Sequence, residues 1–179
     1  MTENAALITT LLSLATLVAD VLLIAVLGGM LLGKYPQDYL PAPLVRPVLL
    51  SGALIASAAI ALSLWYSEIV GFEPCTLCWW QRIFIYPQAV LFFIAWQRAD
   101  YGVWRYTLPL SVFGLFFAGA HWLLQTFDVS LLPCAADGPD CSKIYFQEFG
   151  YVTFPVMAIT TLLMLLAVSL VARREERRG

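Results

Sequence analysis

Five long apolar runs constrain this chain more than any other feature, and they cover approximately residues 5–32, 44–66, 79–96, 106–127 and 152–172. A helix of about 20 apolar residues is long enough to cross the hydrocarbon core of a bilayer, and there only helices and closed barrels satisfy their backbone polar groups. Charged residues make up 12% of the chain, against about a quarter in soluble domains. The sequence therefore predicts an all-α integral membrane protein that forms one helical bundle.

The polar segments argue against a nucleic-acid partner and against a cleaved leader. The formal net charge is −2, and no stripe of basic residues is available to bind a phosphate backbone. Residues 1–4, ahead of the first apolar run, contain no basic residue, whereas a signal peptide begins with a basic region followed by a short apolar core. We therefore expect the first run to be a transmembrane helix.

Basic residues are concentrated in alternate connecting segments, and their distribution predicts the orientation of the helices. Most of them flank the first connector, flank the third connector or follow the last run: Lys34, Arg46, Arg98, Arg105, Arg173, Arg174, Arg177 and Arg178. The other soluble segments contain only Lys143, with Arg82 at a helix edge. Basic segments stay cytoplasmic, so we expect the N-terminus outside, the C-terminus inside and all four cysteines on the outer face. That face is the oxidising side of a bacterial inner membrane, where disulfides persist.

The four cysteines form two pairs of different design. Cys75 and Cys78 make a Cys-x-x-Cys motif directly before the third apolar run, whereas Cys134 and Cys141 lie in the longest polar loop, residues 128–151. A disulfide across two intervening residues constrains little of the unfolded chain, so this motif is more often redox-active than structural. At a helix N-terminus the helix dipole stabilises the thiolate, which is the reactive form. The two pairs suggest an electron path from a soluble donor to an acceptor dissolved in the bilayer.

Arg82 and His121 are the polar residues best placed to bind a ligand near the tight pair. Arg82 follows Cys78 by four residues, so a helix places it on the same face, one turn deeper. It would stabilise a thiolate and hold a ligand oxygen, or else extend to the interface as an isolated charge. His121, the only histidine, lies about 9 Å inside the outer end of its run, with Gln125 one turn further out. The ring either borders the same ligand as Arg82 or hydrogen-bonds to a neighbouring helix.

Other polar, glycine and aromatic residues in the apolar runs have a structural and a functional interpretation. Asp20, near the middle of the first run, is a functional candidate by default, although the sequence offers no partner and favours a structural role. Gly29 and Gly33 are spaced to allow close helix contact. Trp79 and Trp80 are expected first as interface anchors, and packing against a flat ligand ring is the alternative.

The cysteine motifs and their surroundings resemble the DsbB family of disulfide-forming membrane proteins, and the BdbC-type branch in particular. Three motifs carry the resemblance: Glu-Pro-Cys-Thr-Leu-Cys-Trp-Trp-Gln-Arg at 73–82 followed by Tyr86-Pro87, His-Trp-Leu-Leu-Gln at 121–125 leading to Pro133-Cys134, and Cys-Ser-Lys at 141–143 leading through Phe149-Gly150 to Pro155. Their order and spacing cover about residues 45 to 170. The resemblance implies a four-helix transmembrane bundle core with two extracytoplasmic cysteine loops over residues 41–179. Residues 1–40 would be an extra N-terminal transmembrane helix with its cytoplasmic connector.

The resemblance implies a quinone-dependent protein thiol oxidase that reoxidises a soluble extracytoplasmic thioredoxin-fold dithiol protein (DsbA- or BdbD-like). Two electrons would pass to a membrane quinone, either ubiquinone or menaquinone. The matching positions imply that the partner attacks Cys134, whose loop mate is Cys141. Cys75 would exchange electrons with this loop pair, and Cys78 would face the quinone as a thiolate. Arg82 and His121 would bind the quinone, and the positions of Trp79 and Gln125 add them as further candidates for the same site.

Two features depart from the family pattern. Only six residues separate Cys134 from Cys141, whereas the best-known members have a much longer interval that holds a membrane-parallel helix. A tighter hairpin is therefore expected, and any lateral helix would follow Cys141, where residues 142–149 either lie flat on the membrane or pack back on the bundle. The apolar run at 5–32 is extra to the four-helix core and has no assigned role.

Two other functions are compatible with four cysteines in a small membrane bundle. A quinone reductase similar to the vitamin K epoxide reductase family would have its loop pair before the Cys-x-x-Cys motif, and the order here is the reverse. A non-enzymatic membrane scaffold would bind structural zinc through all four thiolates. The six-residue gap is wide for such a site, and an oxidising compartment works against keeping thiolates reduced.

Overall fold

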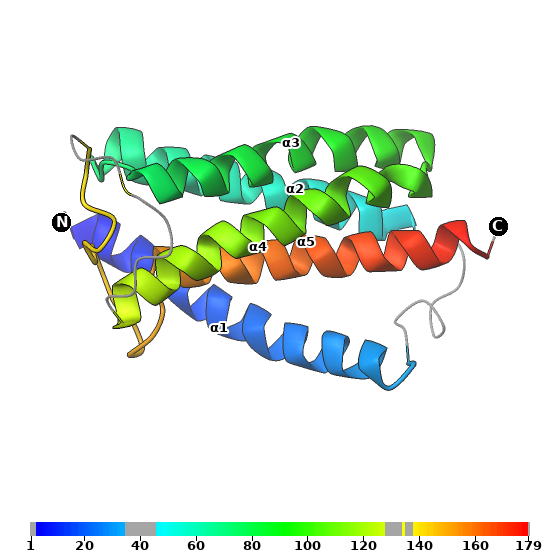
Figure 1. Cartoon of the computed structure of the whole chain (residues 1–179), viewed down its shortest axis with the longest axis horizontal. Helices are drawn as coiled ribbons and strands as arrows, with labels where there is room; N and C mark the ends of the chain where they lie inside the picture. The colour runs from blue at the N-terminus through cyan, green and yellow to red at the C-terminus, as the bar shows by residue number, and fades with distance from the viewer. Residues whose placement is uncertain (1–2, 35–45, 128–133, 135–137, 179) are drawn as a thin grey trace.

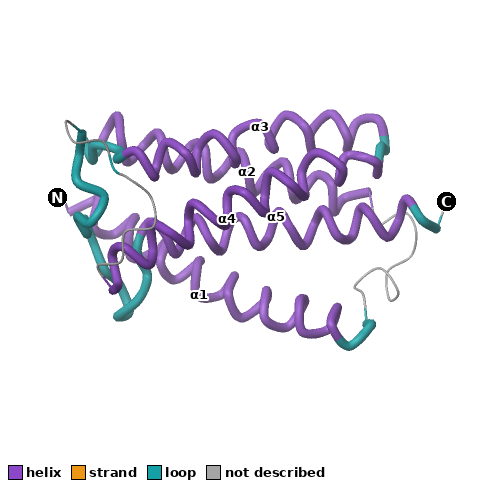
Figure 2. The backbone as a smooth tube through the Cα atoms, viewed as in Figure 1, coloured by secondary structure: helices purple, strands orange, loops and turns teal. Residues whose placement is uncertain are grey.

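The computed structural model describes residues 3–34, 46–127, 134 and 138–178, and helices account for most of them (Figures 1 and 2). The α-helices are α1 (Glu3–Leu31), α2 (Arg46–Leu64), α3 (Thr76–Arg98), α4 (Trp104–Phe127) and α5 (Phe154–Glu176). A π-helical turn, η3 (Trp65–Ile69), extends α2, and a 3₁₀ turn, η4 (Tyr101–Val103), precedes α4. Within the described residues, five helical segments are long and apolar enough to cross a membrane. The predicted all-α, multi-pass membrane architecture is confirmed.

Each predicted apolar run corresponds to one helix, and local contacts explain where two of the ends differ. α3 begins directly after Cys75, which has extended backbone as the N-cap and whose carbonyl accepts a hydrogen bond from the Trp79 N–H at 3.1 Å. α5 continues beyond the predicted residue 172 because its last turn is held to α4. Glu176 accepts a hydrogen bond from Trp104 Nε1 at 2.7 Å and forms an ion pair with Arg105 at 2.8 Å.

α2, α3, α4 and α5 pack as a ring in which each helix contacts the next and α5 contacts α2. The buried core combines small residues such as Ala56 and Ala89 with large ones such as Phe92 and Leu162. Small side chains allow transmembrane helices to approach closely. Two glycines mark the tightest points: an added Cβ would lie 2.7 Å from a Leu162 methyl at Gly114 of α4 and 2.9 Å from the Phe92 ring at Gly52 of α2.

Polar side chains inside the ring are paired between helices. The Thr107 hydroxyl of α4 lies 2.7 Å from the Ser169 hydroxyl of α5. Ser111 of α4 donates a hydrogen bond of 3.2 Å to the Gln88 amide oxygen of α3. Side chains of this kind inside a membrane normally find partners on neighbouring helices, so these bonds join α4 to both of its neighbours.

α1 lies outside the ring, packs against α5 and diverges from it toward its C-terminal end (Figure 1). Two polar contacts hold its first two-thirds. The Tyr66 hydroxyl donates to the Thr9 hydroxyl at 3.0 Å, while Asp20 accepts from the Thr160 hydroxyl at 2.6 Å and from the Tyr151 hydroxyl at 3.1 Å. Asp20 therefore has partners on α5 and on the segment before it, which agrees with the structural role that the sequence favoured.

The glycine pair at the end of α1 terminates the helix, and among the described residues no other helix comes within 4 Å of an added Cβ at Gly29 or Gly33. Gly33 has a φ of +75°, a left-handed conformation that favours glycine. The Lys34 N–H donates to the Gly29 carbonyl at 2.9 Å, which is the usual hydrogen bonding of a helix C-terminus with such a residue. The spacing of four therefore reflects the local end of the helix.

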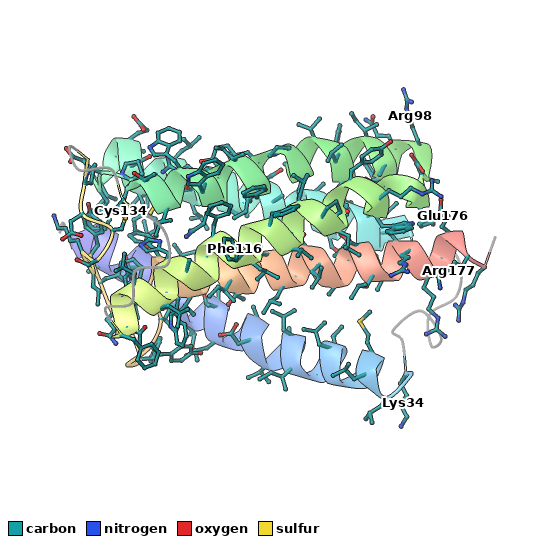
Figure 3. All side chains as sticks on the ribbon, in the orientation of Figure 1. Lys34, Arg98, Phe116, Cys134, Glu176 and Arg177 are labelled. Atoms are coloured by element: carbon teal, nitrogen blue, oxygen red, sulfur yellow. A yellow bond between two sulfur atoms is a disulfide. The ribbon has the colours of Figure 1, made fainter. Side chains whose placement is uncertain are left out.

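The outer surface and the two ends of the bundle differ in chemistry. Large apolar side chains such as Ile24 and Val90 are exposed on the outward faces of the helices, as expected for surfaces that contact lipid. Figure 3 shows Lys34, Arg98 and Arg177 at one end of the bundle and Cys134 at the other. The basic end and the cysteine end are therefore opposite each other along the helix axes.

Candidate redox site

The two cysteine pairs meet at one end of the bundle. Cys134 and Cys141 form a disulfide, and Cys75 and Cys78 are free thiols whose sulfur atoms lie 3.3 Å apart. Cys75 and Cys141 are both buried and share one apolar cluster with Leu77, whereas Cys134 is only partly buried. A soluble reactant can therefore reach Cys134 more readily than Cys141. Cys75 is the buried thiol of the tight pair in this cluster, and Cys78 packs against its edge.

The N-terminus of α3 gives the two thiols of the tight pair different surroundings. Cys75 is the N-cap and Cys78 lies in the first turn, where the helix dipole favours negative charge. When Cys75 is ionised, the Cys78 thiol donates a hydrogen bond to it, and this bond lowers the pKa of Cys75 to about 4. Burial opposes this by raising the pKa, and His121 reinforces the lowering. Cys75 is therefore the thiol of the pair that ionises more readily.

His121 of α4 connects the tight pair with the loop. Its Nδ1 lies 3.1 Å from Nε2 of Gln81, and its Nε2 lies 3.1 Å from the Cys141 carbonyl oxygen and 3.9 Å from the Cys75 sulfur. We assign the ring proton to Nε2, because the Gln81 amide then donates to Nδ1 and the Nε2–H donates to the carbonyl. The same N–H is in reach of a Cys75 thiolate, and the ring is only 2% exposed.

Gln125 fixes the loop against α4 one turn beyond His121. Its amide nitrogen donates to the Lys143 carbonyl at 3.2 Å and lies 3.3 Å from Nε2 of His121. The segment after Cys141 therefore has a defined position above the histidine. This placement makes Gln125 a contact of the loop.

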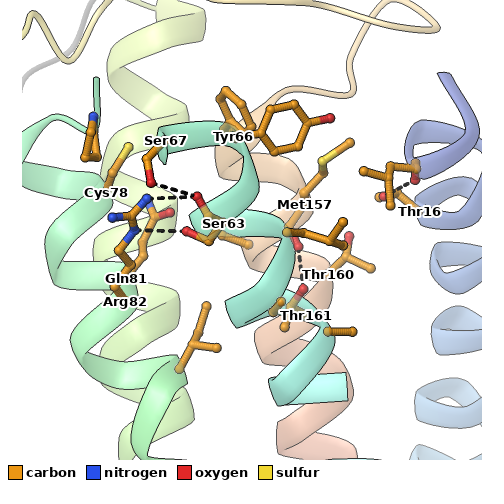
Figure 4. A pocket seen from close by; sticks show the side chains of 18 of the residues that line it. Thr16, Ser63, Tyr66, Ser67, Cys78, Gln81, Arg82, Met157, Thr160 and Thr161 are labelled. Atoms are coloured by element: carbon orange, nitrogen blue, oxygen red, sulfur yellow. Dashed lines mark hydrogen bonds between the residues drawn. The ribbon is translucent and has the colours of Figure 1, made fainter. Parts of the chain in front are cut away.

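Cys78, unlike Cys75, lines a pocket of about 370 Å³. Arg82 lines the same pocket, where its Nε donates to the Ser63 hydroxyl at 2.9 Å and its Nη2 donates to the Ser63 carbonyl at 3.1 Å (Figure 4). Neither bond uses Nη1. The remaining walls are mostly aliphatic and aromatic side chains from α1, α2 and α5. The pocket thus combines a thiol and a guanidinium with a largely apolar space.

Only one of the four residues predicted to bind the quinone, Arg82, belongs to the lining of this pocket. Trp79 is 54% exposed, and its ring centroid lies 5.0 Å from the Arg82 guanidinium carbon. His121 and Arg82, which the sequence placed at one ligand headgroup, do not line this pocket together. The described lining residues come from helices on the α2 side of α3, whereas α4 packs on another side and places His121 and Gln125 against the loop disulfide.

Sequence reasoning missed three residues of the site. Ser63 orients Arg82, Tyr66 lines the pocket and binds α1, and Gln81 holds the His121 ring. Gln81 and Ser63 are polar groups near the outer end of an apolar run. A polar side chain is energetically unfavourable within a membrane span, and this is the signal that could have identified both residues.

The segment after Cys141 packs back on the bundle and forms no helix over residues 142–149. The Tyr145 ring stacks on Phe72 with centroids 4.6 Å apart, and its hydroxyl donates to the Glu73 carbonyl at 2.9 Å. Phe146 packs edge-on against Phe154 at 4.6 Å. Of the two alternatives for this segment, the structure shows the packed one. Part of the expected tight hairpin between the loop cysteines lies outside the described residues.

A metal could in principle be held where three ligand atoms converge. The sulfurs of Cys75 and Cys78 and a ring nitrogen of His121 lie within 4.8 Å of one another. The loop cysteines are bonded to each other, so the four-thiolate zinc site considered from the sequence is not formed in this structure.

Comparison with known proteins gives a consistent result. A family model described as "Disulfide bond formation protein DsbB" matches residues 45–172. The chain is 36% identical to a "Probable disulfide formation protein" of Metapseudomonas resinovorans over 75% of this chain and 94% of that one. It is also 36% identical to "Probable disulfide formation protein C" of Halalkalibacterium halodurans over 74% and 97% of the two chains. For "Disulfide bond formation protein C" of Bacillus subtilis (strain 168), the identity is 36% over 63% and 83%.

The search of solved structures found no match. The family match covers well over half of the chain and includes both cysteine pairs, and the geometry places these pairs next to each other. The chain belongs to the DsbB family, and it is a membrane disulfide oxidoreductase with a role in disulfide bond formation.

Proposed function

We propose that this protein oxidises a soluble extracytoplasmic thioredoxin-fold dithiol protein and passes the two electrons to a membrane quinone. The observation that carries the proposal is the division of the tight cysteine pair. Cys75 is buried in one cluster with Cys141 of the loop disulfide, whereas Cys78, at the edge of that cluster, also lines the largely apolar pocket together with Arg82. A pair placed in this way can take electrons from the loop on one side and release them to a lipid-soluble acceptor on the other.

The positions of the charged residues support the orientation that this function needs. Basic side chains lie at the end of the bundle opposite Cys134 (Figure 3), and basic segments of membrane proteins are retained in the cytoplasm. The cysteines would then face the periplasmic or extracytoplasmic side of a bacterial inner membrane, with the N-terminus outside and the C-terminus inside. This is the compartment in which a dithiol oxidase is exposed to its substrates.

Burial supports Cys134 as the position that the partner attacks. Cys141 is 1% exposed, and a thiolate on a protein the size of a thioredoxin domain cannot reach it without opening the loop. Cys134 is the more accessible sulfur. Attack there would form a mixed disulfide and release Cys141 as the leaving thiolate next to Cys75.

Two thiol–disulfide exchanges would then carry the two electrons from the partner to the Cys75–Cys78 pair. The partner's two thiols become a disulfide while the Cys134–Cys141 disulfide becomes two thiols. These two thiols reduce a Cys75–Cys78 disulfide and return to the disulfide state. When the Cys75–Cys78 dithiol is reoxidised, it gives up two electrons and two protons. A quinone would supply the acceptor and leave as quinol.

The residues around the pocket fit a quinone. Arg82 is held rigidly by Ser63 and keeps Nη1 out of both bonds, so this donor can bind a carbonyl oxygen. Cys78 lines the same pocket, where a thiol could act on the ring of a flat ligand. The apolar walls suit the remainder of a lipid-soluble molecule. His121, by contrast, would stabilise the Cys75 thiolate during exchange with the loop.

Quinone reduction by purified protein, with a reduced thioredoxin-fold dithiol protein as donor, tests the proposal. Wild-type protein should turn over, and Cys78→Ser should not. Arg82→Gln should raise the KM for quinone about tenfold, equivalent to about 1.4 kcal/mol. Arg98→Gln, at the opposite end of the bundle, is the matched control and should match the wild type. Full quinone-dependent turnover by Cys78→Ser would refute the assigned electron path.

The proposed point of attack has its own test. With the Cys134–Cys141 disulfide intact, an excess of a partner with one thiol should displace Cys141 as a thiolate and accumulate as a mixed disulfide on Cys134, which peptide mapping can locate. Trapping on Cys75 instead would show that the loop pair is bypassed.

A further inference from the structure

α1 lies beyond the range of the family match, which begins at residue 45, yet it forms part of the pocket that contains Cys78. Its contribution comes from one helical face, because Leu12, Ala15, Thr16 and Ala19 line the pocket and residues spaced by three and four lie together on a helix. The ring of α2 to α5 is therefore open on one side of this pocket, and α1 covers that side.

Two polar contacts hold this stretch of α1, and they flank it in the sequence. Thr9 accepts from the Tyr66 hydroxyl on one side, and Asp20 accepts from Thr160 and Tyr151 on the other. Asp20 is expensive to place within a membrane span, and its two hydrogen bonds account for its position. The helix is thus fixed over residues 9–20, which includes all the described α1 residues that line the pocket.

The walls of the pocket change in character from α3 to α1. Cys78, Gln81 and Arg82 supply polar groups from α3. The other helices supply mostly small or flexible apolar residues, including Ala15 of α1, Ala58 of α2 and Met164 of α5. Figure 4 shows Arg82 and Cys78 on one side of the pocket and Thr16 of α1 on the opposite side. A ligand that fills this space needs a polar head and an apolar extension.

We propose that α1 forms the wall of a subsite for the prenyl chain of the quinone. This inference rests on the proposed function, which places the quinone ring at Cys78 and Arg82. The chain would leave the ring between the Ala15 face of α1 and the facing side chains of α2 and α5. Alanines at 15, 19, 58 and 59 leave room for it. The role of α1 is therefore to bind the apolar part of the acceptor, which the four-helix ring alone leaves uncovered.

Photo-crosslinking of the full-length protein tests this without relying on activity. The probe is a quinone analogue whose prenyl chain carries a diazirine near the ring. Peptide mapping should find the label on α1 within residues 12–19, and an excess of unlabelled prenylquinone should remove it. Label confined to α3 and α5 would overturn the proposal. Competition by phospholipid as effective as that by prenylquinone would also overturn it, because an ordinary acyl chain would then be the occupant.

A matched pair of substitutions provides the kinetic test. Ala15→Phe fills the subsite, whereas Ala25→Phe places the same side chain at an exposed α1 position outside the described lining. For each protein, the KM for a prenylated quinone is divided by the KM for a tail-less quinone of the same ring. We expect Ala15→Phe to raise this ratio at least fivefold and Ala25→Phe to leave it at the wild-type value. An unchanged ratio in Ala15→Phe would refute the subsite.

The failures of the two proposals can be told apart. If the wild-type protein reduces neither quinone, the proposed function itself is wrong. If it reduces both and Ala15→Phe changes the two KM values equally, the quinone function stands and only the prenyl subsite is refuted. Loss of folding in Ala15→Phe would abolish turnover with both quinones, and the crosslinking of the wild-type protein then decides the question.

Discussion

Replacement of His121 by phenylalanine should make the Cys75–Cys78 pair a weaker oxidant. The Nε2–H of His121 lies 3.9 Å from the Cys75 sulfur, and its removal withdraws one of the interactions that lower the pKa of Cys75. Hydrogen bonds to charged groups contribute about 1.5–3 kcal/mol, and the long N–S distance places this one near the lower limit. A loss of about 1.4 kcal/mol corresponds to a rise of about one pKa unit. For a two-electron couple it lowers the midpoint potential by about 30 mV.

The midpoint potential is measured by equilibrium redox titration in a Cys134→Ser, Cys141→Ser background, where the Cys75–Cys78 pair is the only pair that can be oxidised. The sign follows from the thiolate. Its stabilisation favours the reduced form above the pKa of about 4 and disappears as the pH falls through that value. The difference in midpoint potential between the variant and the wild type should therefore have its full value at pH 7 and decrease as the pH approaches 4.

Gln125→Leu is the control, because Gln125 contacts the same ring without a bond to sulfur. It should leave the potential unchanged. Cys78→Ala should raise the pKa of Cys75 more than His121→Phe does, because the Cys78 hydrogen bond is the largest cause of the lowering. A His121→Phe potential equal to that of the wild type, or one that is more oxidising, would refute the role of His121.

Three further substitutions test packing, each by thermal unfolding in detergent micelles. Gly52→Ala should lower the free energy of unfolding by about 1–3 kcal/mol through overpacking, because its Cβ would lie 2.9 Å from the Phe92 ring. Gly119→Ala is the control and should leave the stability unchanged, because its Cβ meets no atom within 4 Å. Equal effects of the two substitutions would contradict the packing argument. Asp20→Ala should lower the free energy of unfolding by about 1.2 kcal/mol, since it removes two hydrogen bonds worth about 0.6 kcal/mol each in a membrane. An unchanged stability would mean that these bonds do not hold α1. Tyr145→Phe should cost about 0.5–1.5 kcal/mol for one hydrogen bond, and a larger loss would show that the hydroxyl does more than bind its carbonyl partner.

The positions of the helices could be predicted from the sequence because the bilayer imposes a length and a polarity on every span. Those constraints act on each segment separately, so no tertiary contact is needed to find α1 to α5. The Cys-x-x-Cys motif and Arg82 were predictable for a similar reason. Their spacing of three and four residues on one helix determines which side chains share a face.

The ligand set was less predictable because it depends on the order of the helices around the ring. His121 lies at a depth similar to that of Arg82, but depth does not say which side of α3 faces α4. The structure directs His121 to the Cys141 carbonyl and Cys75, whereas Arg82 faces Ser63 of α2. Two residues at one depth therefore lie on opposite sides of the same helix, α3.

By itself, the sequence determined that this protein is a helical membrane protein with two cysteine pairs, because apolar length and short-range spacing are local properties. Only the tertiary structure decided which thiol meets the loop, which one lines the pocket, and that α1 covers this pocket between the bonds of Thr9 and Asp20. These arrangements arise from contacts between residues far apart in the chain. Asp20 and Thr160, for example, are 140 residues apart, and no local pattern in the sequence records their contact.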